Sequence, residues 1–501
     1  MARSTSKKGV SKSFPLPKRA RAPLALVTSA LCLLSLVYII SYAPQIGILS
    51  KLAIGVISLL VAGLLITRIL GILGTGGLYI LKTSRGLDFI DHLSKRYARF
   101  WTAMVDWGLV LSFGVLTYLF FKKHVSRKML VLGIISILVM QVFILPYIIL
   151  ALNLISTPQF SIQQSSSYVP SSSFAQYLQY AFYAASLVGG FSLYILSELV
   201  YVAAIIVHGI AAFIIAALSP HVTVAQAAGN LPPPAGVPVA VVPFLEPSIA
   251  IPLILSLILL VTLHEISHGV IARQYGIRLK SIGTFIFGII PGGAFVEPDE
   301  KSINKLPREK QDKISIAGVS FNYLLTLVFF ALMVFTYYFV LPGLTATRVY
   351  VEATVLGSPA YNTIPAGTII LSWNNHTIHN LTDLQAAGAM DKPYSPVNIV
   401  TPNTTYSVLA DASGKIGVYL GLKTVPITNS VLGAAADFLY IFFALSFMLN
   451  FYVAIFNILP LPLFDGWRIY KLRISEKKLR LITILALIVF VLLFVPWIWS
   501  L

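Results

Sequence analysis

The chain has 501 residues, of which 57% are hydrophobic and only 11% are charged, and its mean hydropathy is +0.85. A typical soluble protein carries about a quarter charged residues. This composition therefore indicates a polytopic membrane protein and excludes a secreted enzyme or a disordered scaffold. The formal net charge is +18, but the basic residues gather at the ends of apolar segments, as membrane topology requires. We therefore expect no nucleic-acid partner.

Ten apolar segments are long enough to cross a bilayer. They lie near 24–43, 47–71, 102–121, 129–154, 178–197, 199–218, 248–272, 314–341, 432–456 and 480–500. Residues 1–22 carry many basic side chains and no acid, which predicts a disordered cytoplasmic tail. Residues 23–247 are expected to form an N-terminal membrane region of several helices. Intramembrane Asp106 and His208 are interpreted as packing contacts.

Charge gives the orientation of the remaining segments. Basic residues follow the segments at 248–272 and 432–456, so both of these ends should lie in the cytoplasm. The stretch 345–425, which is more polar and alternates like short strands, then lies outside. Its length suits a small domain inserted between two membrane helices.

The most specific motif is His264-Glu265-Ile266-Ser267-His268, near the cytoplasmic end of the 248–272 segment. Two histidines at i and i+4 lie on one helix face and can bind one zinc ion, one per chain. Glu265 is then placed as general base for a water that the zinc activates. Such residues are costly inside a membrane unless they pair or bind metal.

Zinc needs a third protein ligand, and the best candidate is Asp465 in the segment Asn457-Ile-Leu-Pro-Leu-Pro-Leu-Phe-Asp465-Gly. The two prolines end the preceding helix, and Asp465 lies at the same expected depth as His268. Three other carboxylates compete for this role: Glu297, Asp299 and Glu300.

These motifs, with the intervening Ala317-Gly-Val-Ser-Phe-Asn322 helix, resemble the site-2 protease family of intramembrane zinc metalloproteases, and archaeal members in particular. The resemblance covers about 248–341 and 432–475. It implies His264, His268 and Asp465 as zinc ligands and Glu265 as the base, with Asn322 and Asn457 ordering the site or the substrate. Val319 and Phe464 depart from the family pattern without removing a reactive group.

The segment 281–296 is apolar but rich in glycine and proline, which argues against a straight helix. It predicts a re-entrant β-hairpin beside the zinc. An unwound substrate could add a strand to its edge. The expected substrate-binding residues are Ile289, Ile290, Gly292 and Gly293.

The insert at 345–425 resembles a PDZ domain of the kind that some site-2 proteases carry. It contains no Gly-Leu-Gly-Phe carboxylate-binding loop, so its expected role is a size filter for substrates.

The expected fold is thus a polytopic α-helical membrane protein. It has a three-to-four-helix metalloprotease core (first half 248–341, second half 432–501), a re-entrant β-hairpin and a small extramembrane PDZ-like α/β domain. The expected function is zinc-dependent intramembrane proteolysis of transmembrane protein substrates in the cell membrane, with the active site near the cytoplasmic face. The lipid bilayer is the other expected partner, and a homo-oligomer is compatible with the sequence. A membrane zinc or proton-coupled transporter is the alternative, and a catalytically silent scaffold is a third reading.

Overall fold

The computed structural model describes residues 17–42, 48–72, 74–121, 125–148, 172–219, 222–228, 231, 247–426 and 431–496. Seven of the helices described there are long and apolar enough to cross a membrane, so the chain is a polytopic helical membrane protein. One compact unit holds the described residues up to 329 and from 445 onward, and a second unit holds those between 330 and 444.

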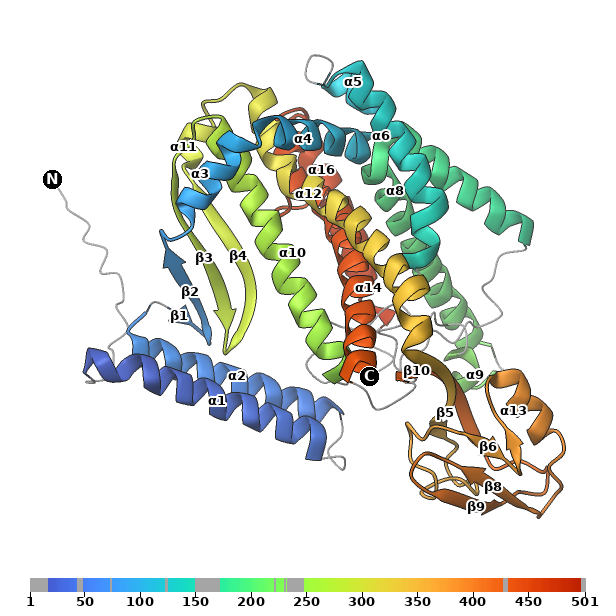
Figure 1. Ribbon diagram of the computed structural model, residues 1–501. Coiled ribbons are helices and arrows are strands. Elements are labelled where there is room, and N and C mark those ends of the chain that lie inside the picture. The colour runs from blue at the N-terminus through green and yellow to red at the C-terminus, as the bar shows by residue number, and fades with distance from the viewer. Residues whose placement is uncertain are drawn as a thin grey trace. The chain divides into compact units, whose positions relative to one another are not determined.

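Two N-terminal helices pack against each other and cross the end of a four-stranded antiparallel sheet (Figure 1). They are α1 (Lys18–Tyr42) and α2 (Ile48–Leu70). A Cβ added at Gly77 or Gly288 would meet the α2 backbone at Leu60 or Leu59, and both glycines have positive φ. Glycine is therefore required where the sheet's turns approach this helix. Because α1 begins at Lys18, the basic segment is helical from there on, and the expected tail to residue 22 is too long; residues 1–16 lie outside the described part.

The sheet contains the expected hairpin and an additional strand from the N-terminal region. Its order is β1 (Gly74–Thr75), β2 (Leu78–Thr83), β3 (Leu279–Phe287) and β4 (Ile290–Pro298). In the antiparallel register Leu78 lies opposite Phe287 and Thr83 opposite Ile282. The N-terminal strands thus cover the β3 edge, and β4 remains an edge strand within the described residues.

Several short elements and one long helix follow in the N-terminal region. They are α3 (Leu87–Arg96), α4 (Ala98–Phe113), α5 (Leu116–Phe120), α6 (Arg127–Val139), η1 (Met140–Ile144), α8 (Ser172–Ala217) and α9 (Val224–Ala228). The spans expected at 178–197 and 199–218 fall in α8, which consists of two helical segments joined by a kink at Gly190, so the break lies within the first expected span. The span expected at 102–121 is interrupted at Gly114.

The two interruptions have one cause. The backbones of Gly114 and Gly190 approach so closely that a Cβ on either would collide with the other segment. Leu187 lies in α8 just before the kink, and its carbonyl accepts the N–H of Val115 at 3.0 Å. A hydrogen bond inserted into a helix ladder is a recognised cause of a kink.

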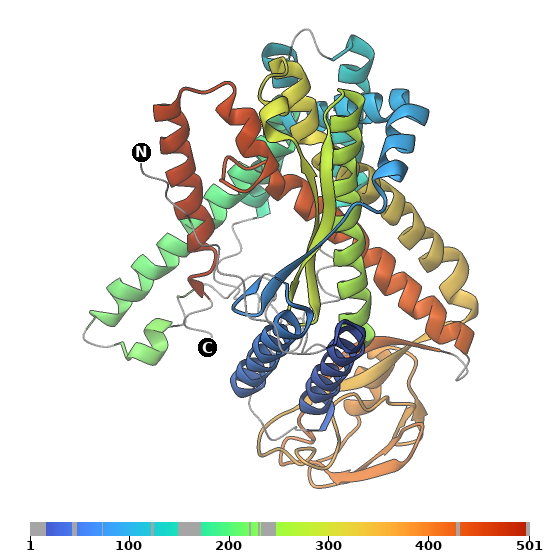
Figure 2. The same cartoon turned by 90° about the vertical axis from the view of Figure 1, so that its left-hand side faces the viewer.

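The core helices are α10 (Pro247–Gln274), α11 (Glu300–Ile303), α12 (Arg308–Phe335), α14 (Val431–Asn457), α15 (Asp465–Lys471) and α16 (Glu476–Leu492). The α10 helix runs alongside the β3–β4 hairpin (Figures 1 and 2). The last expected span, 480–500, is represented by α16, whose 17 residues are slightly short for a bilayer crossing.

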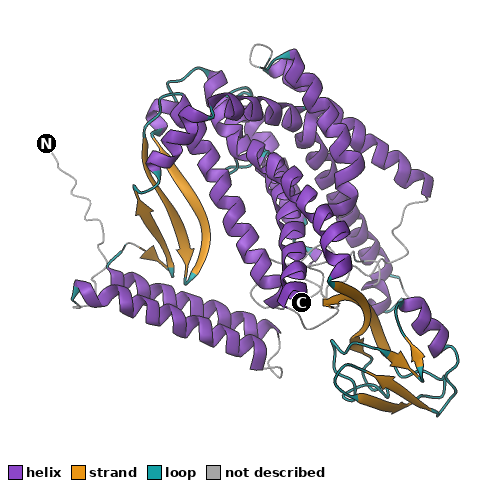
Figure 3. Cartoon of the chain, in the orientation of Figure 1, coloured by secondary structure: helices purple, strands orange, loops and turns teal. Residues whose placement is uncertain are grey.

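The second unit continues from α12 through η3 (Thr336–Val340) and η4 (Leu341–Gly343) into a small α/β domain (Figure 3). Strands β5 (Thr345–Thr354) and β10 (Val418–Pro426) form an antiparallel pair. A second sheet has the order β7 (His376–Thr377), β6 (Ser372–Trp373), β8 (Pro396–Val400) and β9 (Thr405–Leu409). Helix α13 (Leu381–Gly388) contributes Leu384 and Ala387 to a core that also contains Val349 and Trp373.

Candidate metal centre and active site

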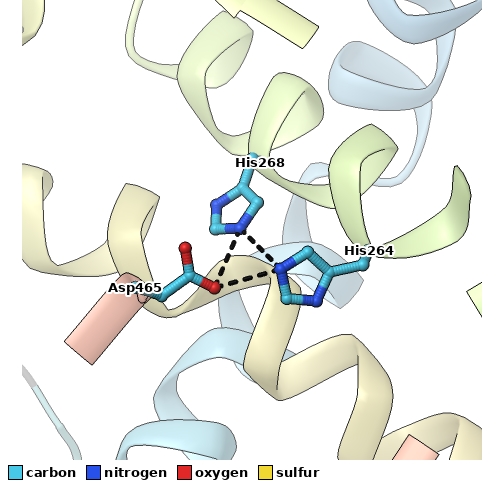
Figure 4. A group of neighbouring side chains, drawn as sticks. All are labelled: His264, His268 and Asp465. Atoms are coloured by element: carbon cyan, nitrogen blue, oxygen red, sulfur yellow. Dashed lines mark hydrogen bonds and ion pairs between the residues drawn. The ribbon is translucent and has the colours of Figure 1, made fainter. Parts of the chain in front are cut away.

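Three side chains from distant parts of the chain converge on one point (Figure 4). His264 and His268 lie one turn apart on α10, and Asp465 is the first residue of α15. The Nε2 atom of His264 lies 3.0 Å from Asp465 Oδ2, and the Nε2 atom of His268 lies 3.3 Å from the same oxygen. The two Nε2 atoms are 3.2 Å apart.

These distances can be compared with the geometry of a zinc site. Zinc binds imidazole nitrogen and carboxylate oxygen at about 2.0–2.1 Å in a tetrahedron, whose ligand atoms are then separated by roughly 3.3 Å. The observed 3.0, 3.3 and 3.2 Å are close to that separation. The residues present therefore fit a tetrahedral ion with its fourth position open, which is the arrangement of a catalytic zinc site.

Hydrogen bonds from α12 orient both imidazoles. The Nδ1 of His268 lies 2.7 Å from the Ile314 carbonyl, which can only accept, so this nitrogen carries the proton and Nε2 keeps its lone pair for a metal. The Nδ1 of His264 lies 3.0 Å from Nδ2 of fully buried Asn322. The Oδ1 of the same amide has no hydrogen-bond partner among the described residues. Turning the amide over would present this oxygen to a protonated Nδ1 and would leave His264 in the same metal-binding tautomer.

Gly318 leaves space for the two rings. It lies on α12 directly over the site, and a Cβ there would collide with the His264 ring and with Nε2 of His268. Sequence reasoning included this glycine in the Ala317–Asn322 motif but gave it no role. The sequence does contain a signal for this role. Gly318 lies one helical turn before Asn322 and therefore on the same helix face, where it has no side chain.

Glu265 lies beside the three ligands and contacts the sheet. Its Oε2 accepts the backbone N–H of Val296 at 3.2 Å. This N–H therefore points toward α10 and away from β3. In an antiparallel strand the N–H and C=O of one residue point to the same side, so Val296 presents both groups to α10. Glu265 also lines a cavity of about 350 Å³ together with His268, Asp465, Leu463 and Arg468.

The remaining predicted residues lie in other places. Asn457 is the last residue of α14 and, within the part of the chain that the structure describes, does not join these hydrogen bonds. Ile289 and Ile290 are at the hairpin end and pack against apolar side chains of the α1–α2 pair. Gly292 and Gly293 lie in β4, between this end and Val296. The structure therefore does not bring the two isoleucines to the metal centre.

The three competing carboxylates have other partners. Glu297 accepts hydrogen bonds from Lys82 and Ser281, each at 2.7 Å, and these bonds hold the pKa of its carboxyl below the usual range. Asp299 accepts from Ser302 at 2.6 Å, and Glu300 pairs with Arg468. Among the described residues, the group of three that could hold an ion is His264, His268 and Asp465.

Ion pairs connect the centre to the N-terminal region. Arg273, near the end of α10, donates to both carboxylate oxygens of Asp91 in α3, which lowers the pKa of that carboxyl. Lys313 lies 2.7 Å from Asp106 of α4, and both side chains are largely buried. Asp106 is thus paired within the protein, in line with the contact that the sequence suggested.

The sequence was also compared with known protein families. Residues 252–496 match the model of peptidase family M50. The matched stretch is just under half of the chain, and it is similar to this family. This confirms the resemblance to the site-2 protease family. The M50 match includes all three clustered residues and Glu265.

Two relatives support the M50 assignment. An uncharacterized protein of Methanocaldococcus jannaschii is 27% identical over 267 residues, which are 51% of this chain and 66% of the relative. A membrane-bound transcription factor site-2 protease homolog of Arabidopsis thaliana is 31% identical over 152 residues, which are 28% of each protein. The chain thus aligns with just under two thirds of the archaeal relative and with about a quarter of the plant relative.

Proposed function

We propose that this protein is a zinc-dependent endopeptidase that cleaves transmembrane segments of membrane proteins within the bilayer. The observation that carries the proposal is the set of ligand-to-ligand distances among His264, His268 and Asp465, with Glu265 beside them. The match of the plant site-2 protease homolog to part of the chain supports the same activity. One zinc ion per chain would be held by these three ligands, with its fourth coordination position open.

The protein's own groups account for proton transfer. Zinc, when bound, supplies a Lewis acid that polarises the scissile carbonyl and acidifies the attacking water. Glu265 takes the proton from this water and delivers it to the departing amine. The Ile314 carbonyl and Asn322 keep both imidazoles oriented during this transfer.

The substrate would bind as an extended strand, because a helical peptide bond hides its carbonyl. Val296 directs its backbone groups toward α10 at the position of Glu265, and a second cavity of about 350 Å³ lies on the sheet side of Glu265. A substrate strand added to β4 would therefore pass the catalytic base. Gly292 and Gly293 lie on this path, whereas Ile289 and Ile290 anchor the hairpin.

The same proposal places the active site near the cytoplasmic face of the cell membrane. Arg273 ends α10 five residues after His268, and Arg468 follows Asp465 in α15. The PDZ-like domain would then lie outside, where it would restrict access of substrates with large outside domains.

Zinc removal tests the function directly. The purified protein in detergent, supplied with a single-span substrate whose helix is destabilised, should lose cleavage after dialysis against a chelator. Stoichiometric zinc should restore it, whereas magnesium should not. Cleavage that persists without metal would contradict the proposal. Zinc uptake into proteoliposomes without any cleavage would instead favour transport.

A further inference from the structure

The loop before Asp465 contains a backbone conformation that its residue does not favour. The N–H of Phe464 donates to the carbonyl of Leu461 at 3.2 Å, which closes a four-residue turn. Pro462 occupies the second position, and Leu463 occupies the third with φ of 82°. This is the pattern of a type II turn, whose third position calls for glycine or asparagine. A leucine there is strained, because its Cβ approaches the backbone in the left-handed region.

Within the part of the chain that the structure describes, no neighbour stabilises this leucine in compensation. The residue is fully exposed there, so it gains no packing energy. The adjacent rim carries the ion pair between Glu300 and Arg468, whose side chains are 58% and 32% exposed. Charged groups of that kind border water or lipid headgroups rather than acyl chains, and both residues line the same cavity as Leu463.

The location of the strained residue is specific. Leu463 lines the same cavity of about 350 Å³ as Glu265, His268 and Asp465, and Asp465 follows it by two residues. Strained conformations that persist without local compensation cluster at active sites and ligand clamps. An exposed apolar side chain beside a catalytic base is suited to contact an apolar group of a bound peptide.

We propose that Leu463 is a specificity-determining residue that packs against an apolar side chain of the substrate next to the scissile bond. This inference rests on the proposed function. The ligand class is an aliphatic or aromatic side chain of an unwound transmembrane segment. Binding of the substrate buries Leu463, and the apolar area removed from water offsets the strain of the turn.

The first test replaces the side chain by residues that the turn prefers. Leu463→Gly and Leu463→Asn should retain zinc and keep or raise Tm, because both residues relieve the strain. Their kcat/KM for an apolar single-span substrate should fall about tenfold or more, mainly through KM. Leu463→Met should lose less than Leu463→Asn, because it keeps an apolar contact. Leu356→Gly, at an exposed leucine of the inserted domain, should leave kcat/KM unchanged.

A substrate series identifies the contact. Apolar residues around the cleavage site are changed singly to serine, and each peptide is assayed with the wild type and with Leu463→Gly. At one position the loss seen with the wild type should disappear in the variant. A variant with raised Tm but unchanged kcat/KM for every peptide would overturn the inference, while cleavage by the wild type would leave the proposed function intact.

A binding measurement covers the case in which no cleavage is observed. A photo-crosslinking amino acid placed at position 463 in the Glu265→Gln protein should capture the single-span peptide. The same amino acid at position 356 should not capture it. Failure of capture at 463 would overturn the inference whatever the outcome of the cleavage assay.

Discussion

At the residue scale, the metal centre depends on space as well as on ligands. Gly318 of α12 has no side chain, and only for this reason can the rings of His264 and His268 approach Asp465 as closely as they do. The neighbouring Asn322 is fully buried and contacts His264. On the face of α12 that points to the site, Gly318 therefore leaves space for the rings and Asn322 supplies a polar contact.

Gly318→Ala should displace the two imidazoles and lower zinc affinity by about 10–100-fold, the range found when groups that orient metal ligands are altered. Competition with a chromophoric zinc chelator measures this change. Gly343→Ala is the matched control, since a Cβ at Gly343 meets no atom within 4 Å. Equal zinc affinities for the two variants would show that the space at Gly318 is not required.

The sequence predicts the residues of the site better than their contacts. His264, Glu265 and His268 follow from helical spacing, and Asp465 follows from its place after two helix-breaking prolines. The contacts of Ile314 and Val296 could not be predicted, because each uses a backbone group and any residue type supplies one. The strain at Leu463 likewise depends on a backbone angle that the sequence does not display.

At the element scale, two ion pairs fix the start of α12. Asp312 accepts hydrogen bonds from both terminal nitrogens of Arg473, which lies just after α15. Arg473 also lies over the ring of Phe121 at 4.0 Å. The adjacent Lys313 pairs with Asp106 of α4. Because Ile314 follows directly and bonds His268, these pairs hold the carbonyl that orients one ligand.

Asp312→Asn should destabilise the protein by about 3–5 kcal/mol, because it removes one partner of a buried pair and leaves the Arg473 charge behind. Thermal unfolding in detergent measures the loss. The double variant Asp312→Leu, Arg473→Met should recover much of it, since no buried charge remains. A double variant no more stable than the single one would contradict this explanation.

The elements themselves were only partly predictable. The β3–β4 hairpin follows from its glycines and apolar strands, whereas β2 was not foreseen because its partner lies about 200 residues away in the chain. The kink in α8 and the break after α4 arise from one contact between Gly114 and Gly190. A long-range approach of this kind breaks the helix within the expected span 178–197 and interrupts the one expected at 102–121.

At the scale of the whole molecule, the inserted domain begins and ends at one place. Strands β5 and β10 pair along their length, and Thr345 lies opposite Pro426. Paired residues of antiparallel strands lie about 4.5–5.5 Å apart, so a short linker can replace everything between them. The insert is therefore separable from the membrane helices by its connectivity.

Replacing residues 346–425 by a short glycine-rich linker should preserve cleavage of a single-span substrate with a short outside segment. If the insert is a size filter, the variant should also cleave a substrate with a bulky outside domain, which the wild type should reject. A comparison of the two substrates in proteoliposomes measures both effects. Rejection of the bulky substrate by the variant would contradict the filter role.

The sequence predicted the class of the whole molecule because composition alone requires a membrane. The sequence suggested ten apolar spans, whereas seven of the described helices are long and apolar enough to cross a membrane. One reason is that α4, with 16 residues, is shorter than the apolar segment that contains it. The M50 match begins at residue 252, so the N-terminal region had no family pattern to guide its interpretation. Its strand β2 and its partners Asp91 and Asp106 connect it to the part of the chain that matches the M50 model.

The most direct test of the account compares the wild type with Glu265→Gln in cleavage of a helix-destabilised single-span substrate, with zinc content measured in both. Glutamine has nearly the same shape but cannot accept the proton, so the variant should hold one zinc per chain and lose about 10²–10⁴-fold in rate. Equal cleavage by the two proteins would contradict the role of Glu265 as base. A variant without zinc would show instead that Glu265 helps to build the metal centre.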